Sequence, residues 1–201
     1  MNLKNEWLDP LFLEDFLSEE EKSIKKNTNK FCKEVLLNDV VKNNRSHFFD
    51  KKIYKEFGSM GLLGSTVKGY GSPEINKVSY GLIAYEIESI DSSYRSAISV
   101  QSSLVCYPIE LFGSDNQKKE YLPDLIKGNI VGCFGLTESE AGSDPSSMKT
   151  SYKKENDHYI INGTKNWITN APIADLFLIW ALNEKKEINL FLIPKNTKGL
   201  S

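Results

Sequence analysis

The sequence predicts an α+β fold, in which an N-terminal helical domain over residues 1–128 is followed by a β domain over residues 129–201. Apolar residues recur at helical spacing through the first two-thirds of the chain, whereas the last third holds short runs rich in β-branched and aromatic residues. Stretches rich in glycine, asparagine and serine separate these segments. The 201 residues, 40% of them hydrophobic, are enough for one good core or two small ones.

The helical part contains a clear start signal. Ser18 stands three positions before Glu21, which is the spacing of a capping box, and apolar residues follow at helical intervals. Helices are expected over residues 18–37, 50–60, 75–90, 91–112 and 114–127. The Gly-rich stretch GSTVKGYGSPE between two of these helices is expected to be a connection with turn chemistry throughout.

The β part is expected to begin with a buried strand. Strands are predicted over residues 129–138, 158–163, 164–170, 174–182 and 188–194. The second and third flank Asn162-Gly163, a dipeptide typical of two-residue hairpin turns, so they are predicted to pair with each other. A small sheet of this kind has unpaired edges and a face that needs cover. We therefore expect the chain to be the front part of a longer protein.

Charge and residue spacing exclude several classes of function. The formal net charge of −2 shows no basic excess for nucleic acid or an anionic membrane, and no apolar run has the length of a membrane span. The cysteines, Cys32, Cys106 and Cys133, are too widely spaced for a disulfide framework or a zinc site, so buried reduced thiols are expected. His47 and His158 are isolated, which argues against a metal site or a His-based triad.

Two stretches of the β part contain candidate binding residues. In CFGLTESEAGSDPSS a strand leads into a loop with Gly142, Ser143 and Asp144, whose backbone and hydroxyl donors can approach phosphates closely. The loop matches neither a P-loop nor a Rossmann glycine motif. In NWITN the strand period predicts that Trp167 and Thr169 face one side, as a wall for a planar heteroaromatic ring. Taken singly, an ordinary turn and an ordinary packed hairpin remain the alternatives.

Together these stretches resemble the acyl-CoA dehydrogenase family, whose members are flavoenzymes that use FAD. The resemblance runs from about residue 7 to the end of the chain, and the motifs YRSAISVQSSL, GCFGLTE, AGSDPSSMKT and NGTKNWITNAPIADLFLIWA look closest to glutaryl-CoA dehydrogenase. It implies that the strands begin the family's middle β-barrel-like domain. The family's C-terminal helical bundle, with its catalytic glutamate, is absent from this chain, so no catalytic residue is expected here.

The resemblance also implies roles for particular residues. Residues 134–137 would line the flavin, with Thr137 at the pyrimidine edge of its ring. Gly142 and Ser143 would meet the FAD pyrophosphate or the CoA part of the substrate. The indole of Trp167 would flank the flavin ring, and Thr169 would lie near its N5 atom. The implied cofactor contacts are Phe134, Gly135, Leu136, Thr137, Gly142, Ser143, Trp167, Ile168 and Thr169, and Ser143 is also an implied substrate contact.

Arg95 is implied to bind the terminal carboxylate that distinguishes glutaryl-CoA from ordinary acyl-CoA substrates. A fixed guanidinium offers a bidentate partner for a charge that is costly to bury alone. Ser96 and Ser99 would contact the substrate as well, and Glu88 would hold the polar network. The alternative is that Arg95 forms a structural salt bridge with Glu88 or Asp91.

The family often has proline after the Thr-Glu pair, where this chain has Ser139 followed by Glu140. Proline would stiffen the turn, so its loss puts the rigidity of the loop in question. The charge of Glu140 would oppose bound phosphates if it faced them.

The implied reaction is α,β-dehydrogenation of glutaryl-CoA, with decarboxylation to crotonyl-CoA and CO₂ as in lysine and tryptophan degradation. Electrons would pass to electron-transfer flavoprotein, and the full-length protein would be a homotetramer, whereas this segment alone is expected to be inactive. The alternatives are another acyl-CoA dehydrogenase and a truncated, non-catalytic remnant that binds flavin or acyl-CoA. The expected location is the bacterial cytoplasm, with the mitochondrial matrix as the alternative.

Overall fold

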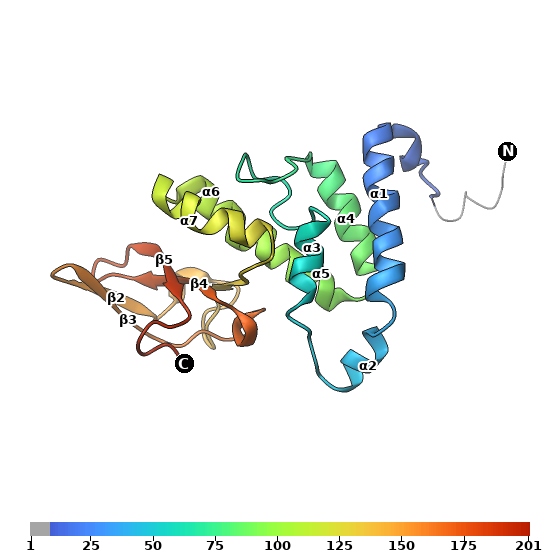
Figure 1. The fold of residues 1–201 in the computed structure, drawn as a ribbon. Coiled ribbons are helices and arrows are strands. Elements are labelled where there is room, and N and C mark those ends of the chain that lie inside the picture. Colours follow the sequence, from blue (N-terminus) through green and yellow to red (C-terminus); the bar gives the residue numbers. More distant parts are fainter. Residues whose placement is uncertain (1–8) are drawn as a thin grey trace. The chain divides into compact units, whose positions relative to one another are not determined.

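The computed structural model describes residues 9–201, which divide into two compact units. The first takes in the chain up to Phe49 together with Ile75–Arg95, and the second takes in Asp50–Glu74 and Ser96–Ser201. Helices come first along the chain and the strands follow, as Figure 1 shows, so the predicted α+β order is confirmed. The predicted boundary after residue 128 stays a prediction, and residues 1–8, where the predicted helical domain and the family resemblance begin, lie outside the described part of the chain.

The first unit is helical. Its elements are a 3-10 turn (Leu13–Phe16), α1 (Glu19–Phe31), a π-helical stretch (Cys32–Leu36), α2 (Val40–Arg45) and α4 (Lys77–Glu88). The predicted capping box is present at the start of α1, where the backbone N–H of Glu21 donates to Ser18 Oγ at 3.2 Å and Ser18 N–H donates to the Glu21 carboxylate at 2.8 Å. The first helix packs against α4, and there Asn29 donates to the buried carboxylate of Glu86 at 2.6 Å. The short helix α2 is an addition that the apolar spacing does not indicate.

The second unit contains the remaining helices. They are α3 (Ile53–Ser59), a π-helical stretch (Val100–Cys106), α6 (Tyr107–Phe112) and α7 (Asp115–Ile126), and α5 (Ser92–Ser99) leads into this unit from the first. The predicted helix over 91–112 is thus a continuous helical segment with a π-helical middle. On that middle part, the fully buried Gln101 donates to the carbonyls of Leu125 at 3.0 Å and Ile130 at 2.9 Å, and accepts from the Gly132 N–H at 2.8 Å. This amide joins the helix to the chain that enters the sheet.

The ends of α7 are well defined. Ser114 and Gln117 form a second capping box at its start. After the helix, Gly128 has a φ of 70°, and a Cβ on it would lie 1.9 Å from the carbonyl oxygen of Tyr54. Glycine is therefore required here by both conformation and space.

The sheet of the second unit is mixed. Its strands are β1 (Gly132–Gly135), β2 (Ser151–Glu155), β3 (His158–Asn162), β4 (Leu176–Leu182) and β5 (Ile188–Pro194). The strand β4 pairs with β5 in antiparallel fashion along its whole length; it pairs in parallel with β1, from Gly132 opposite Leu176, and with β2 at Leu182. The predicted strand over 174–182 is confirmed with a start two residues later, and the predicted strand over 188–194 is confirmed with the same bounds.

The predicted pairing across Asn162-Gly163 is wrong. Instead, β3 pairs with β2, from Ser151 opposite Asn162 to Glu155 opposite His158. The turn lies at Asn156-Asp157, and Asn156 has the positive φ (54°) that asparagine tolerates. Residues 163–170 contain no strand and belong to the connection between β3 and β4.

The core of the second unit lies between its helices and β4. The cluster consists of Val67, Val105, Cys106, Ile109, Leu122, Leu125, Ile126, Leu176 and Leu178. All of its members are nearly inaccessible to solvent, so burial of apolar area fixes the helices on the sheet. The thiols of Cys32, Cys106 and Cys133 are buried and unpaired, as predicted. Within residues 9–201, no helix has the length and apolarity needed to cross a membrane.

Candidate functional site

Two loops of the second unit are bound to each other beside the end of β1. We call them the paired loops: residues 136–138, which follow β1, and residues 165–169, which precede β4. The ammonium of Lys165 donates to the carbonyl oxygen of Leu136 at 3.0 Å and to Glu138 Oε1 at 2.7 Å. The backbone N–H of Asn166 donates to the carbonyl oxygen of Thr137 at 2.9 Å. These contacts bring together two of the stretches that the sequence singled out.

Glu138 and Lys165 form a buried ion pair at the centre of the paired loops. Each side chain is only 8% exposed. The Glu138 carboxylate also accepts from the backbone N–H groups of Lys149 at 2.6 Å and Thr150 at 3.0 Å. Burial by itself raises the pKa of Glu138, but the hydrogen bonds from Lys165 and from the Lys149 and Thr150 backbone outweigh it and lower this pKa to about 2. The Glu138 carboxyl is therefore ionised at neutral pH.

Sequence reasoning gave no role to either member of this pair. Both residues lie inside the quoted motifs, Glu138 in GCFGLTE and Lys165 in NGTKNWITN. Opposite charges in two segments that are otherwise apolar or small-sided are the signal that could have suggested it.

The paired loops present hydrogen-bond donors that the described chain does not use. Thr137 is half-buried, and neither its N–H nor its hydroxyl donates to another residue within 9–201. The same holds for the N–H and hydroxyl of Thr169, which is exposed. The carbonyl oxygen of Ile168, the residue before Thr169, accepts from the Ala171 N–H at 3.1 Å. Free donors on a firmly held backbone are what a polar ring edge needs for binding.

The predicted strand geometry of Trp167 and Thr169 is wrong. Trp167 has a left-handed φ of 59°, and Asn170 has a φ of 72°. The backbone around Thr169 is therefore not extended, and the strand period does not place Trp167 and Thr169 on one side. The indole of Trp167 is 93% exposed. An exposed large aromatic ring on a held loop is suited to stack on a planar ligand.

The residues of β1 have a packing role beside the paired loops. The Phe134 ring meets the Trp180 ring edge-on, with centroids 5.9 Å apart and an interplanar angle of 70°. Gly135 is buried, and a Cβ on it would lie 2.4 Å from Ile179 Cδ1 and 3.4 Å from Lys165 Cγ. Glycine at this position thus lets the stem of Lys165 pass close to the strand.

The small-residue loop after Glu138 is open to solvent. Gly142 and Ser143 are both exposed, and a Cβ on Gly142 would meet nothing within 4 Å. Next to them, Asp144 accepts hydrogen bonds from the hydroxyls of Ser146 and Ser147, which lower its pKa. The loop can therefore offer the backbone at Gly142 and Ser143, whereas the two following hydroxyls are already engaged.

The structure also shows what Glu140 does. Its carboxylate forms an ion pair with the ammonium of Lys149, and both side chains are largely exposed. The hydrogen bond from Lys149 lowers the pKa of Glu140. The negative charge that seemed to oppose bound phosphates thus has a cation as its partner within the same loop region.

Arg95 pairs with Glu88, one of the two partners proposed as the structural alternative. Its Nε lies 2.6 Å from Glu88 Oε2, with 37% of the arginine side chain and 45% of the glutamate side chain exposed. Ser92 Oγ donates to the other carboxylate oxygen at 2.6 Å, and the hydrogen bonds from Ser92 and Arg95 lower the pKa of Glu88. The other proposed partner, Asp91, accepts from the Ser93 N–H at 2.7 Å instead.

The pairing engages only one of the three guanidinium nitrogens of Arg95. Its two terminal nitrogens make no hydrogen bond or ion pair with any residue from 9 to 201. Ser96 and Ser99 lie on the same helix α5 and are half-buried, with Ser99 one turn after Arg95. Arg95 and Glu88 belong to the first compact unit, whereas Ser96, Ser99 and the predicted cofactor contacts belong to the second.

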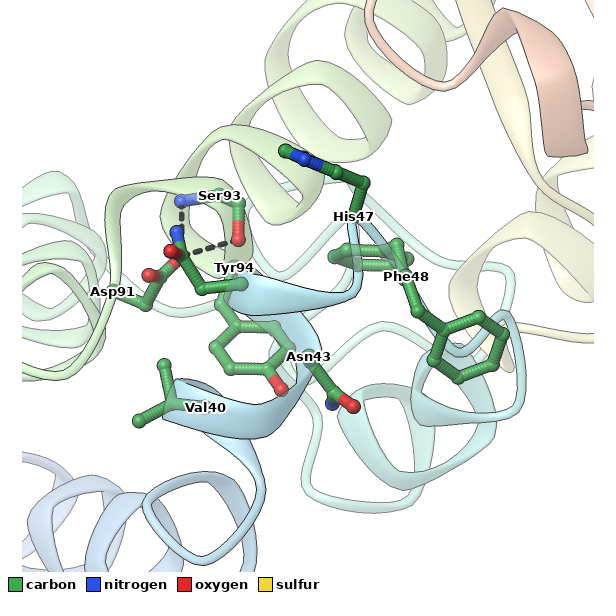
Figure 2. Close-up of a pocket in the computed structure, with 9 residues that line it drawn as sticks. Val40, Asn43, His47, Phe48, Asp91, Ser93 and Tyr94 are labelled. Atoms are coloured by element: carbon green, nitrogen blue, oxygen red, sulfur yellow. Dashed lines mark hydrogen bonds between the residues drawn. The ribbon is translucent and has the colours of Figure 1, made fainter.

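A cavity of about 220 Å³ lies in the first unit, and three of the residues that line it, Asp91, Ser93 and Tyr94, precede Arg95 in the sequence (Figure 2). Its lining combines aromatic, amide and acidic side chains from the α2 region and the start of α5. The lining residues are Val40, Asn43, Asn44, His47, Phe48, Phe49, Asp91, Ser93 and Tyr94. None of the predicted site residues lines it. Among residues 9–201, no group of three His, Cys, Asp or Glu side chains is placed to hold a metal ion.

Comparison with known proteins relates this geometry to a family. The acyl-CoA dehydrogenase N-terminal domain profile matches residues 18–129, and the acyl-CoA dehydrogenase middle domain profile matches residues 133–201. The chain belongs to the acyl-CoA dehydrogenase family. The paired loops and the small-residue loop both lie in the part that matches the family's middle domain.

Individual relatives agree with this assignment. The chain is 32% identical to a mitochondrial isovaleryl-CoA dehydrogenase of Pongo abelii over 92% of its own length and 46% of the relative's. It is 37% identical to an acyl-CoA dehydrogenase of Bacillus subtilis over 76% of its length and 42% of the relative's. Among solved structures, a glutaryl-CoA dehydrogenase of Mycobacterium smegmatis in complex with FADH2 is 39% identical with a TM-score of 0.94, over 96% of this chain and 50% of that chain. The chain therefore spans about half the length of the relatives it matches.

Proposed function

We propose that the chain is part of an FAD-dependent acyl-CoA dehydrogenase that oxidatively decarboxylates glutaryl-CoA to crotonyl-CoA and CO₂. Membership of the family supports the reaction class, and the likeness to a glutaryl-CoA dehydrogenase solved with FADH2 supports the cofactor and this substrate. The observation that carries the substrate is the state of Arg95, which is held by Glu88 through Nε and keeps its terminal nitrogens available.

The residues of the chain fit FAD. The unused donors of Thr137 and Thr169 would meet the polar edge of the flavin ring, and the exposed indole of Trp167 would cover its face. The open backbone at Gly142 and Ser143 would face the pyrophosphate or the CoA part of the substrate. When bound, FAD supplies the acceptor for the two electrons that leave the acyl chain. The protein's own part is to bind the ring, to orient it and to strengthen the donors at its edge.

The Arg95–Glu88 pair fits recognition of a substrate carboxylate. A guanidinium binds a carboxylate best through two parallel N–H···O bonds, and such a pair requires nitrogens that are free of other partners. Glu88 and Ser92 fix the Nε side of Arg95 and so reduce the freedom that the side chain must lose on binding. An acyl chain that ends in a methyl group would gain nothing from this charge. The arrangement therefore favours an acyl group with a terminal carboxylate.

The test compares two substrates in the protein at its natural length. Arg95→Ala should lower kcat/KM for glutaryl-CoA by about 100- to 1000-fold, because a charge-assisted bidentate contact is lost, and should change kcat/KM for butyryl-CoA by only a few-fold. Arg45→Ala is the matched control, since Arg45 is exposed on α2 and makes no ion pair within residues 9–201. Equal losses on the two substrates would refute the assigned substrate and leave a structural salt bridge as the role of Arg95.

The assay also separates the alternatives. If the protein is another acyl-CoA dehydrogenase, for example one with the specificity of the isovaleryl-CoA dehydrogenase that the chain resembles, the unmodified protein would prefer an uncharged acyl chain. A non-catalytic remnant would bleach no flavin with any acyl-CoA. We further propose electron-transfer flavoprotein as the electron acceptor, a homotetramer as the assembly and the bacterial cytoplasm as the location. The mitochondrial matrix is the alternative location, and fractionation of the source cells distinguishes the two.

A further inference from the structure

We infer that Lys165 and Glu138 are positioning residues for the cofactor, which together hold the paired loops and strengthen the Thr137 N–H as a donor to the flavin ring. The inference rests on the proposed function, because it concerns how this chain would bind FAD. It adds two residues that are not among the implied cofactor contacts. Their side chains would act on the cofactor through the peptide group between Leu136 and Thr137.

The first step is the contact between Lys165 and the backbone. Its ammonium donates to the carbonyl oxygen of Leu136 at 3.0 Å. That carbonyl and the N–H of Thr137 belong to the same peptide group. A charged donor on the carbonyl polarises the peptide, so the N–H at its other end becomes a stronger donor.

The next peptide is arranged differently. The Thr137 carbonyl accepts from Asn166 N–H at 2.9 Å, and the N–H of Glu138, at the other end of that peptide, donates to the Ala141 carbonyl at 3.1 Å. Both ends of this peptide are therefore satisfied within the chain. The Thr137 N–H is the donor that is polarised and still unused among residues 9–201, so it is the one directed to a ligand.

Glu138 keeps the charge of Lys165 where it is. Both side chains are 8% exposed, and a buried ammonium without a partner would lose its proton or leave the site. The carboxylate also accepts from the backbone of Lys149 and Thr150, so it ties the paired loops to the chain that enters β2. Gly135 completes the arrangement, since its lack of a side chain gives the Lys165 stem room.

The consequence is a preference of the protein for the reduced cofactor. Reduction increases the electron density on the flavin ring, and a stronger donor at its edge stabilises that state more than the oxidised one. Replacing a charge-polarised donor by an ordinary one should weaken this preference about tenfold. For a two-electron couple, a tenfold change corresponds to a reduction potential about 30 mV lower.

The experiment uses neutral, similarly sized replacements in the protein at its natural length. The variants are Lys165→Met, Glu138→Gln and the double variant Lys165→Met/Glu138→Gln. The matched control is Lys149→Met/Glu140→Gln, which removes an exposed ion pair of the same residue types from the same region. Three quantities are measured for each: the melting temperature without FAD, the FAD dissociation constant and the two-electron potential of the bound flavin.

Lys165→Met alone should melt below the unmodified protein, because it leaves the Glu138 carboxylate buried without its cation. The double variant should recover most of that melting temperature, because no buried charge is left unpaired, and yet its potential should stay about 30 mV below that of the unmodified protein. The control pair should leave the potential unchanged. A double variant with both the melting temperature and the potential of the unmodified protein would show that the pair only stabilises the fold, and would overturn the inference.

Glu138→Gln gives a second reading if the other variants do not fold. It removes the carboxylate that keeps the Lys165 ammonium in place, so the Leu136 carbonyl should lose its charged donor and the potential should fall by about 30 mV, as in Lys165→Met. A potential equal to that of the unmodified protein in this variant would overturn the inference. If the unmodified protein binds no FAD, the proposed function fails together with the inference; if it binds FAD and the variants keep its potential, only the inference fails.

Discussion

The side-chain amide of Gln101 forms hydrogen bonds with three backbone groups in the protein interior, so replacing it tests the fold directly. Its side chain is fully buried and makes hydrogen bonds with the carbonyls of Leu125 and Ile130 and with the N–H of Gly132. Gln101→Met removes these bonds but keeps the length and nearly the volume of the side chain, so it creates little cavity.

The expected loss follows from which groups find no other partner. The Leu125 carbonyl also accepts from Gly128 N–H at 3.2 Å, so it stays satisfied. The Ile130 carbonyl and the Gly132 N–H have no other hydrogen bond within residues 9–201. An orphaned buried polar group costs about 1–3 kcal/mol, so the two together predict a loss of about 2–6 kcal/mol in the free energy of unfolding.

Urea unfolding followed by circular dichroism measures this loss, and the melting temperature should fall by roughly 2–4 °C for each kcal/mol. The control is Asn116→Leu, which removes an exposed amide on α7 and should change stability by no more than about 0.5 kcal/mol. A loss for Gln101→Met below about 1 kcal/mol, or one equal to the control, would refute the reasoning.

Three further changes test other parts of the structure. Ser114→Ala removes one half of the capping box with Gln117 and should lower the free energy of unfolding by about 1 kcal/mol in urea; no change would contradict the cap. Gly128→Ala places a Cβ 1.9 Å from the Tyr54 carbonyl oxygen at a φ of 70°, so we expect a loss of about 2–4 kcal/mol by the same measurement, and a stable variant would disprove the close approach. Because the folded pKa of Glu138 lies at about 2, below its ordinary 4.5, its contribution of about 3 kcal/mol is present above pH 4.5 and is lost as the pH falls toward 2. Acid unfolding of Glu138→Gln should therefore be flatter between pH 4.5 and 2, and an unchanged slope would argue against the ion pair.

The helices could be predicted because their signals are local. The capping boxes at Ser18 and Ser114 need only a few neighbouring residues, and both helix starts are found where such residues stand. The two π-helical stretches could not be predicted in this way, because 5 and 7 residues are too few to show an apolar period distinct from that of the neighbouring α-helices. Gln101, on the π-helical stretch Val100–Cys106, is fully buried although its side chain is polar.

The strands were harder to predict because pairing depends on distant residues. The turn signal at Asn162-Gly163 was overridden by the turn at Asn156-Asp157, so the true partner of β3 is the lysine-rich β2, which has no apolar alternation. The polar pattern of β2 reflects its exposed position, and this removed the usual strand signal.

The candidate site shows the same limit. The sequence motifs named Thr137, Trp167 and Thr169, and the structure places all three on the paired loops. The ion pair behind them joins residues 27 positions apart, Glu138 and Lys165, and each looks like an ordinary surface charge in sequence. Opposite charges in the two motifs could suggest such a pair, but the sequence does not specify which charges meet, so the fold is needed to identify the partners.

The parallel pairing of β1 with β4 also has a consequence for synthesis of the chain. Gly135 is made before its neighbour strand, which begins at Leu176 and pairs with β1 from Gly132 onward. At a ribosomal rate of about 5–20 residues per second, β1 waits roughly 2–8 s for the partner that covers its edge. During that time the nascent chain has to keep an apolar strand from associating with other polypeptides, and the π-helical stretch Val100–Cys106, already complete and packed on β1 in the folded protein, is the surface available to shield it.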